Sequence, residues 1–200
     1  CCGTTPQYIK MISTAAKNHP PRPIPQREKC TTLAGLDSFY IRPEDNFINI
    51  GERANVAGSA RFARLVREEK WDEAIEIVRR QVEDGASIID VCMDAPMIDA
   101  PSAMKHFLRL LAGEPDIARV PFMIDSSSWE ALLEGMKCIQ GKHIVNSISL
   151  KEGEDVFISR AREIMALGHA AVVMLFDEEG QADSYERKVE VASRMYRLLT

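Results

Sequence analysis

The sequence predicts an α/β protein built from repeated strand–helix units, arranged as part of a (β/α) barrel. Short apolar runs alternate with longer amphipathic runs five times between residues 47 and 200. The apolar runs lack polar alternation, as expected for parallel strands that are buried on both faces. Polar residues follow these runs one after another, which is typical of the mouth of a barrel.

The composition is that of a soluble globular protein. The 200 residues are 46% hydrophobic and 28% charged, and their formal net charge is −5. This negative charge argues against nucleic acid or an anionic membrane as a partner. No apolar run is long enough to span a bilayer, and no signal-peptide pattern is present. The five cysteines, an odd number, do not suggest a disulfide framework, so we expect a cytoplasmic location.

The first 45 residues are expected to lie outside the repeated units. Residues 7–18 carry apolar side chains at helical spacing and predict a short helix. Four prolines within residues 20–25 exclude a helix there and predict a stiff, extended connection. We therefore expect residues 1–18 to be the tail of another domain, residues 19–45 to be an interdomain linker, and residues 46–200 to be the barrel domain.

The barrel domain contains five predicted units. Its first strand is predicted at 47–50 and is followed by one long helix over 62–85, which ends at a glycine. The further strands are predicted at 87–92, 120–124, 143–148 and 170–176, and the further helices at 102–112, 129–139, 156–167 and 185–199. Five units cannot close an eight-stranded barrel, so about three more are expected beyond residue 200.

An open, doubly wound sheet is the alternative arrangement of the same elements. The polar residues at the ends of the predicted strands favour the barrel. They are Glu52, Asn55, Asp94, Asp125, Ser126, Ser127, Asn146, Ser147 and Asp177. A barrel gathers the carboxyl ends of its strands around one mouth, where these side chains would converge. An open sheet would spread most of them along its edge.

Taken singly, several polar residues have a structural explanation. Asp125 could cap the helix that begins at Trp129, and Asp177 could belong to a turn. Asp90 is a charge inside an apolar strand, so it needs a partner or must face the mouth. Asn146 is an amide inside another apolar strand and costs stability unless it is hydrogen-bonded. As a set at one mouth, these residues favour a binding site.

The available side chains narrow the type of ligand. The sequence has no Gly-rich phosphate loop, and its four histidines show no metal-ligand spacing. The remaining amides, hydroxyls and carboxylates suit a flat, neutral heterocycle that carries both donors and acceptors. Residues 51–60 are rich in small and hydrogen-bonding side chains between a strand and a helix. They predict either a simple turn or a loop that meets this ligand.

Four stretches of the chain resemble a known family. They are IGERANVAGS at 50–59, PDIARVPFMIDSS at 115–127, CIQGKHIVNSISLKEGED at 138–155 and VVMLFDEEGQAD at 172–183. From about residue 36 to residue 200, the chain resembles the folate-binding domain of cobalamin-dependent methionine synthases. The wider superfamily of pterin-binding barrels supplies the alternatives, which are dihydropteroate synthase and the methyltetrahydrofolate–corrinoid protein methyltransferases.

The resemblance implies a methyltransferase of methionine biosynthesis. It would bind 5-methyltetrahydrofolate for methyl transfer to cob(I)alamin and then to homocysteine, giving methionine and tetrahydrofolate. Cobalamin would be bound by another domain of the same polypeptide. The chain is then expected to be part of a longer enzyme and to be inactive alone, with the fold of a partial pterin-binding (β/α)8 barrel of the dihydropteroate synthase type.

The resemblance also implies which residues form the site. The pterin-binding residues would be Asn55, Gly58, Ser59, Ala60, Asp125 and Asn146, with Glu52, Asp94 and Asp177 as further candidates. Asp125 and Asn146 would bind the edge of the pterin ring, because a carboxylate accepts from ring N–H groups and an amide both donates and accepts. The small residues of the loop would let the backbone approach the ligand.

The first residues, CCGTTP, resemble the end of the homocysteine-binding barrel of the same family. This resemblance implies that Cys1 and Cys2 are two of three thiolate ligands to zinc, with the third cysteine upstream. Zinc would hold the homocysteine sulfur as a thiolate. Cys30, Cys92 and Cys138 match no ligand pattern and are expected in the linker or the core.

Overall fold

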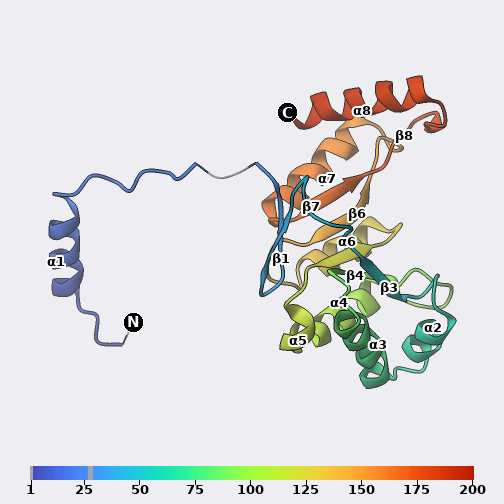
Figure 1. The fold of residues 1–200 in the computed structure, drawn as a ribbon, viewed down its shortest axis with the longest axis horizontal. Coiled ribbons are helices and arrows are strands. Elements are labelled where there is room, and N and C mark those ends of the chain that lie inside the picture. The colour runs from blue at the N-terminus through green and yellow to red at the C-terminus, as the bar shows by residue number, and fades with distance from the viewer. Residues whose placement is uncertain (1, 27–28) are drawn as a thin grey trace.

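A parallel sheet of five strands forms the centre of the computed structural model, which describes residues 2–26 and 29–200 (Figure 1). Its strands are β3 (Ile50–Asn55), β4 (Ile88–Cys92), β5 (Phe122–Asp125), β6 (Ile144–Ile148) and β7 (Ala170–Val173). They lie side by side in chain order. A doubly wound sheet would reverse its strand order, so this arrangement confirms the predicted α/β fold and is consistent with a partial barrel.

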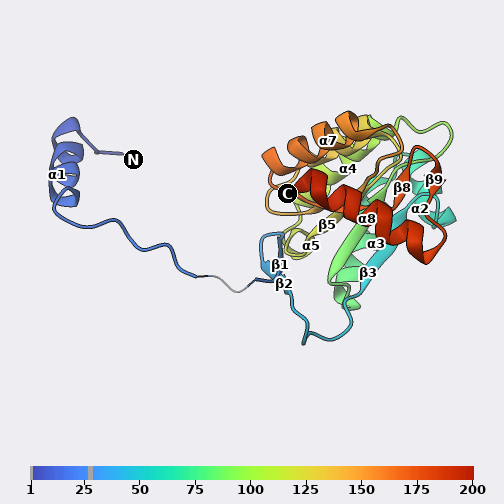
Figure 2. The same ribbon diagram turned by 90° about the horizontal axis from the view of Figure 1, so that it is seen from above.

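The helices between the strands, and α8 after the last strand, cover one face of the sheet (Figure 2). They are α2 (Ala60–Arg67), α3 (Trp71–Glu83), α4 (Ala100–Ala112), α5 (Pro115–Ala118), α6 (Trp129–Met136), α7 (Glu154–Ala166) and α8 (Tyr185–Leu199). Their apolar sides pack against Ile89, Val91, Ile124 and Val145 of the sheet in the larger hydrophobic cluster. This burial is the main source of stability for such a layered fold.

The single helix predicted over 62–85 is wrong, because the structure has two helices there. The chain turns at residues 68–70, where Glu69 has a φ of 54°. Neither glycine nor proline marks this turn in the sequence. The break lets both helices bury an apolar side in the same cluster, with Leu65 from α2 and Val78 from α3. The short helix α5 was not predicted.

The first strand also begins later than predicted. Phe47 is 90% exposed, and the strand covers Ile50–Asn55 instead of 47–50. A bulge between Gly51 and Ala54 interrupts the pairing with β4, so the pattern of side chains resembles a loop. At the other edge, the strand predicted at 170–176 ends at Val173 as β7. Phe176 instead begins a small hairpin of β8 (Phe176–Asp177) and β9 (Gly180–Gln181).

The N-terminal segment contains the predicted helix, α1 (Pro6–Ala16), which is capped by Thr5. None of its residues is buried, and it stands apart from the sheet beyond an extended segment (Figure 1). The segment predicted as a linker also contains an antiparallel hairpin that the sequence did not reveal. Its strands are β1 (Thr31–Ala34) and β2 (Ser38–Ile41).

This hairpin closes the amino-terminal end of the sheet. Leu33 is 2% exposed and packs against Ile88, Met123 and Ile144 in a second hydrophobic cluster. Two backbone hydrogen bonds of 2.9 Å join Ala34 to Lys142. The backbones approach so closely that a Cβ at Gly141, where φ is 115°, would lie 2.3 Å from the Ala34 oxygen. We call the hairpin and this cluster the floor.

Candidate functional site

The face of the sheet opposite the helices changes from apolar to polar along each strand. In β4, Ile89 and Val91 pack with the helices, so the alternation of a strand turns Asp90 and Cys92 to the other face. At the amino-terminal end this inner face is formed by the floor. Its polar part therefore lies at the carboxyl ends of the strands, where barrel proteins place their ligands.

Four side chains form one row across the inner face. Asn55 is paired in register with Cys92, Cys92 with Asp125, and Asp125 with Asn146. Residues in register on neighbouring strands point to the same side of the sheet. We call these four residues the inner row. Three of the sequence-predicted site residues, Asn55, Asp125 and Asn146, thus lie together.

Asn55 links the inner row to the loop that follows β3. Its side-chain Nδ2 donates a hydrogen bond to Oδ2 of Asp90 at 3.1 Å. Its Oδ1 accepts from the backbone N–H groups of Ala57, at 2.9 Å, and Gly58, at 3.1 Å. The Asn55 amide therefore connects a buried carboxylate of β4 to the backbone at the mouth.

The small residues of this loop have separate positions. Ser59 caps α2 by accepting a hydrogen bond from the backbone N–H of Phe62 at 3.3 Å, and Ala60 is the first residue of that helix. Gly58 is exposed, and the nearest atom to a Cβ built there would be Asn55 Oδ1 at 3.9 Å. Protein packing leaves space at this glycine, so a ligand could approach the backbone closely.

Asp94 ties together the loops that follow β4 and β5. Its carboxylate accepts hydrogen bonds from the Ser126 hydroxyl, at 2.6 Å, and from the Ser127 N–H and hydroxyl, at 2.6 and 2.7 Å. The helix cap at this point is Ser128, which accepts from Ala131 N–H. The alternative that Asp125 caps α6 is therefore wrong, and its carboxylate stays on the inner face.

The inner face is acidic. Burial raises the pKa of Asp90 to about 7, the hydrogen bond from Asn55 opposes the rise, and the charges of Asp125 and Glu52 add to it. Burial also raises the pKa of Asp125, as do the charges of Asp94 and Glu52, whereas the Cys92 thiol lowers it. Burial raises the pKa of Cys92 itself to about 12, so its thiol is protonated. A ligand rich in N–H donors matches this set of acceptors.

Asp177 is not a member of the inner row, and Glu52 is exposed on β3, from where its charge acts on Asp90 and Asp125. Asp177 is 4% exposed and pairs with Arg187 of α8, whose Nη2 donates to both carboxylate oxygens at 2.6 and 2.7 Å. It also accepts from the Glu179 N–H at 3.0 Å, so it serves the β8–β9 turn. Its partners are protein groups, which is the turn function considered from the sequence.

The proposed zinc ligands lie at the start of the chain. Cys1 is outside the described residues, and Cys2 is exposed. Within residues 2–26 and 29–200, no three or more His, Cys, Asp or Glu side chains are grouped as a metal site would require. The described residues therefore do not form a zinc site by themselves, and we derive no chemical step through zinc.

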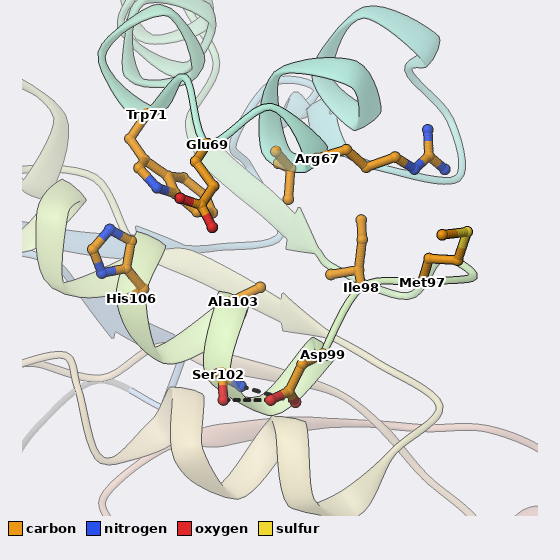
Figure 3. Close-up of a pocket in the computed structure, with 10 residues that line it drawn as sticks. Arg67, Glu69, Trp71, Met97, Ile98, Asp99, Ser102, Ala103 and His106 are labelled. Atoms are coloured by element: carbon orange, nitrogen blue, oxygen red, sulfur yellow. Dashed lines mark hydrogen bonds between the residues drawn. The ribbon is translucent and has the colours of Figure 1, made fainter.

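A hollow of about 390 Å³ lies on the helical side of the sheet between the α2–α3 turn and α4 (Figure 3). The Trp71 and His106 rings meet at its edge, with centroids 4.8 Å apart. Asp99 is engaged as the cap of α4 and binds the Ser102 hydroxyl at 2.6 Å. No member of the inner row lines this hollow, so the two regions are separate.

A partial (β/α) barrel with polar groups at the carboxyl ends of its strands defines the class of small-molecule-binding barrels. Comparison with models of protein families matches residues 51–200 to the family described as pterin binding enzyme. The match spans three quarters of the chain, which therefore belongs to the pterin-binding enzyme family. The fold-level part of the sequence prediction is thus confirmed. Among the described residues, no helix has both the length and the apolar character to traverse a bilayer.

The sequence did not identify the partner of Asp90. Its position inside an apolar strand indicated that it needed a partner or faced the mouth, and it was not included among the site residues. The structure shows that both conditions hold, because Asp90 lies on the inner face and binds Asn55. The two residues are 35 positions apart, so only the register of β3 and β4 reveals the contact.

Proposed function

We propose that this chain binds 5-methyltetrahydrofolate and presents its N5 methyl group to a cobalamin acceptor, as methionine synthases do. The observation that carries the proposal is the inner row, in which a carboxylate and amides lie in register at the carboxyl ends of the strands. Membership of the pterin-binding enzyme family supports the ligand class. The methyl transfer itself rests on the resemblance of the four sequence stretches.

Each residue of the inner row has a proposed task. The Asp125 carboxylate accepts from N–H groups at the edge of the pterin ring, and the Asn146 amide donates to a ring acceptor or accepts from a donor. The backbone of the loop at Gly58 approaches the ring plane. Because an amine is a poor leaving group, N5 must gain a proton during transfer. Burial raises the pKa of Asp125, so its carboxylate is a stronger acceptor for ring N–H groups than an exposed carboxylate would be.

The proposed partners lie outside the described site. Cobalamin, bound by another domain of the same polypeptide, would supply the cobalt centre that receives the methyl group. A zinc site that includes Cys1 and Cys2, together with a further cysteine, would hold homocysteine as a thiolate. Both assignments rest on the resemblance, whereas the cytoplasm as the place of the reaction rests on the odd number of cysteines, which does not suggest a disulfide framework.

The test is to measure two half-reactions in the full-length protein. Asp125→Ala and Asn146→Ala should lower kcat/KM for methyl transfer from methyltetrahydrofolate to cob(I)alamin. A lost hydrogen bond to a charged group costs about 1.5–3 kcal/mol, so the Asp125 variant should lose roughly tenfold to a hundredfold. The Asn146 variant should lose somewhat less, because its amide is neutral. Methyl transfer from supplied methylcobalamin to homocysteine should remain near the wild-type rate.

Asp116→Ala is the matched control, because this carboxylate is 91% exposed and lies on α5, away from the mouth. It should leave both half-reactions unchanged. Equal losses in both half-reactions from well-folded Asp125 and Asn146 variants would mean that these residues are structural. Condensation of a pterin diphosphate with p-aminobenzoate, without methyl transfer, would assign the chain to the dihydropteroate synthases instead.

A further inference from the structure

Asp90 is the most buried carboxyl group of the inner face, and the proposed function gives it no task. Its residue is 2% exposed, and it lies two positions before Cys92 on the same strand, toward the floor. A ligand that rests on the inner row is therefore separated from Asp90 by that row. A carboxyl group that is buried without touching a ligand costs stability unless a protein group hydrogen-bonds to it.

The hydrogen bonds of Asn55 indicate what Asp90 does in the site. An Asn side chain has one oxygen and one NH₂ group, and rotation about its last bond exchanges them. Oδ2 of Asp90 accepts a hydrogen bond from this NH₂ group at 3.1 Å, and in its ionised form the carboxylate can only accept. It therefore turns the Asn55 oxygen toward the loop, where this oxygen accepts from two consecutive backbone N–H groups at 2.9 and 3.1 Å.

We propose that Asp90 is a positioning residue of the pterin site, which holds the loop at residues 57–58 in place through the Asn55 amide and does not contact the ligand. This inference rests on the proposed function for the identity of the ligand. The chain of contacts runs from a buried strand residue, through one side chain, to the exposed backbone at Gly58. A site whose loop is held in this way loses less conformational entropy when the ligand binds.

The Ser59 N–H provides an internal reference for the test. It donates to the backbone oxygen of Asn55 at 2.9 Å, not to the side chain. It therefore lies in the same loop but does not depend on the orientation of the Asn55 amide. Hydrogen exchange of Ala57, Gly58 and Ser59, followed by NMR without ligand, separates the two kinds of contact.

Two substitutions test whether Asp90 acts as a hydrogen-bond acceptor or only fills space. Asp90→Leu replaces the acceptor by an apolar side chain of similar size. It should speed exchange at Ala57 and Gly58 by about tenfold. Exchange at Ser59 should change less than about twofold. Asp90→Asn retains an acceptor oxygen and should restore most of the protection. Equal acceleration at all three amides, or none at Ala57 and Gly58, would overturn the proposal.

Ligand binding gives the second readout. Asp90→Leu should weaken the binding of 5-methyltetrahydrofolate by about five- to tenfold, and Asp90→Asn by less than about threefold. In an Asn55→Ala background, Asp90→Leu should have almost no further effect, since its effect passes through Asn55. Additive losses would mean that Asp90 acts on the ligand directly, contrary to the proposal. If no variant or wild-type protein binds the folate, the proposed function fails, while the exchange experiment still decides on the positioning role.

Discussion

Acidification should destabilise the protein through His143, a buried histidine at the amino-terminal end of β6. Its residue is 1% exposed. Its Nδ1 accepts a hydrogen bond from the backbone N–H of Phe122 at 2.9 Å, and its Nε2 lies 2.8 Å from the carbonyl oxygen of Gln140. Both contacts are satisfied by a neutral ring with its proton on Nε2. Protonation of Nδ1 would break the bond to Phe122.

The size of the effect follows from the pKa. Burial lowers the pKa of His143 to about 4, against the hydrogen bond to Gln140 and with the help of the nearby His169. The unfolded chain binds this proton near pH 6.5, so the stability due to His143 is complete above that pH and is lost as the pH falls toward 4. The whole loss corresponds to about 3 kcal/mol.

Asp90 acts in the opposite direction over the same range. Its pKa is raised from 3.8 to about 7, so the folded state holds a proton that the unfolded state releases above about pH 4. Acidification from neutral pH therefore adds stability through Asp90 and removes it through His143. The pH dependence of the wild-type protein alone would mix the two contributions.

Urea unfolding of the wild type and of His143→Asn separates them. Asparagine keeps an oxygen near the position of Nδ1 but does not titrate. The variant should be less stable at about pH 7, and the gap to the wild type should narrow by about 2–3 kcal/mol at about pH 4.5. The contribution of Asp90 is common to both proteins and cancels. If the two free energies of unfolding run parallel between these pH values, the reasoning about His143 is refuted.

Two further changes test contacts that support the fold. Arg187→Met leaves the 4%-exposed Asp177 without its partner and should lower the free energy of unfolding by roughly 3 kcal/mol, whereas Arg187→Lys should lose less. A urea titration that shows no loss for Arg187→Met would contradict the assigned pairing. Gly141→Ala forces a side chain into a left-handed backbone and against the Ala34 oxygen, so it should cost about 2 kcal/mol or more. Its unfolding midpoint should fall well below that of Gly153→Ala, which shares the left-handed backbone, with φ of 91°, but has open space around it.

The order of the strands and helices was predictable from the sequence, whereas the details of the first unit were not. Strands such as β4 and β6 are largely buried on both faces, so their runs are mostly apolar and were recognised despite Asp90 in β4 and Asn146 and Ser147 in β6. The β3 strand contains a bulge and three exposed or half-buried polar residues, Glu52, Arg53 and Asn55, so its pattern does not alternate. The turn at Glu69 is set by the packing of α2 and α3 on one hydrophobic cluster, and no local residue preference predicts it.

The candidate site was predictable as a set of strand ends but not as a network. Parallel strands share a carboxyl-terminal edge, so Asn55, Asp125 and Asn146 were expected to converge. Which polar group binds which depends on register and on the face of each strand, and these follow only from the pairing of β3 with β4. The floor was missed for a related reason. Its hairpin buries Leu33 through contacts with strands more than 50 positions away in the sequence.

For a folate bound as we propose, the floor leaves only one way to extend. A folate has a rigid ring at one end and a flexible, charged tail at the other. With the ring against the inner row and Leu33 closing the space below, the tail must leave through the mouth toward solvent. Contacts with a solvated tail are screened and contribute little. Recognition then falls on the ring alone, so folates with short and long tails should compete for this protein on nearly equal terms.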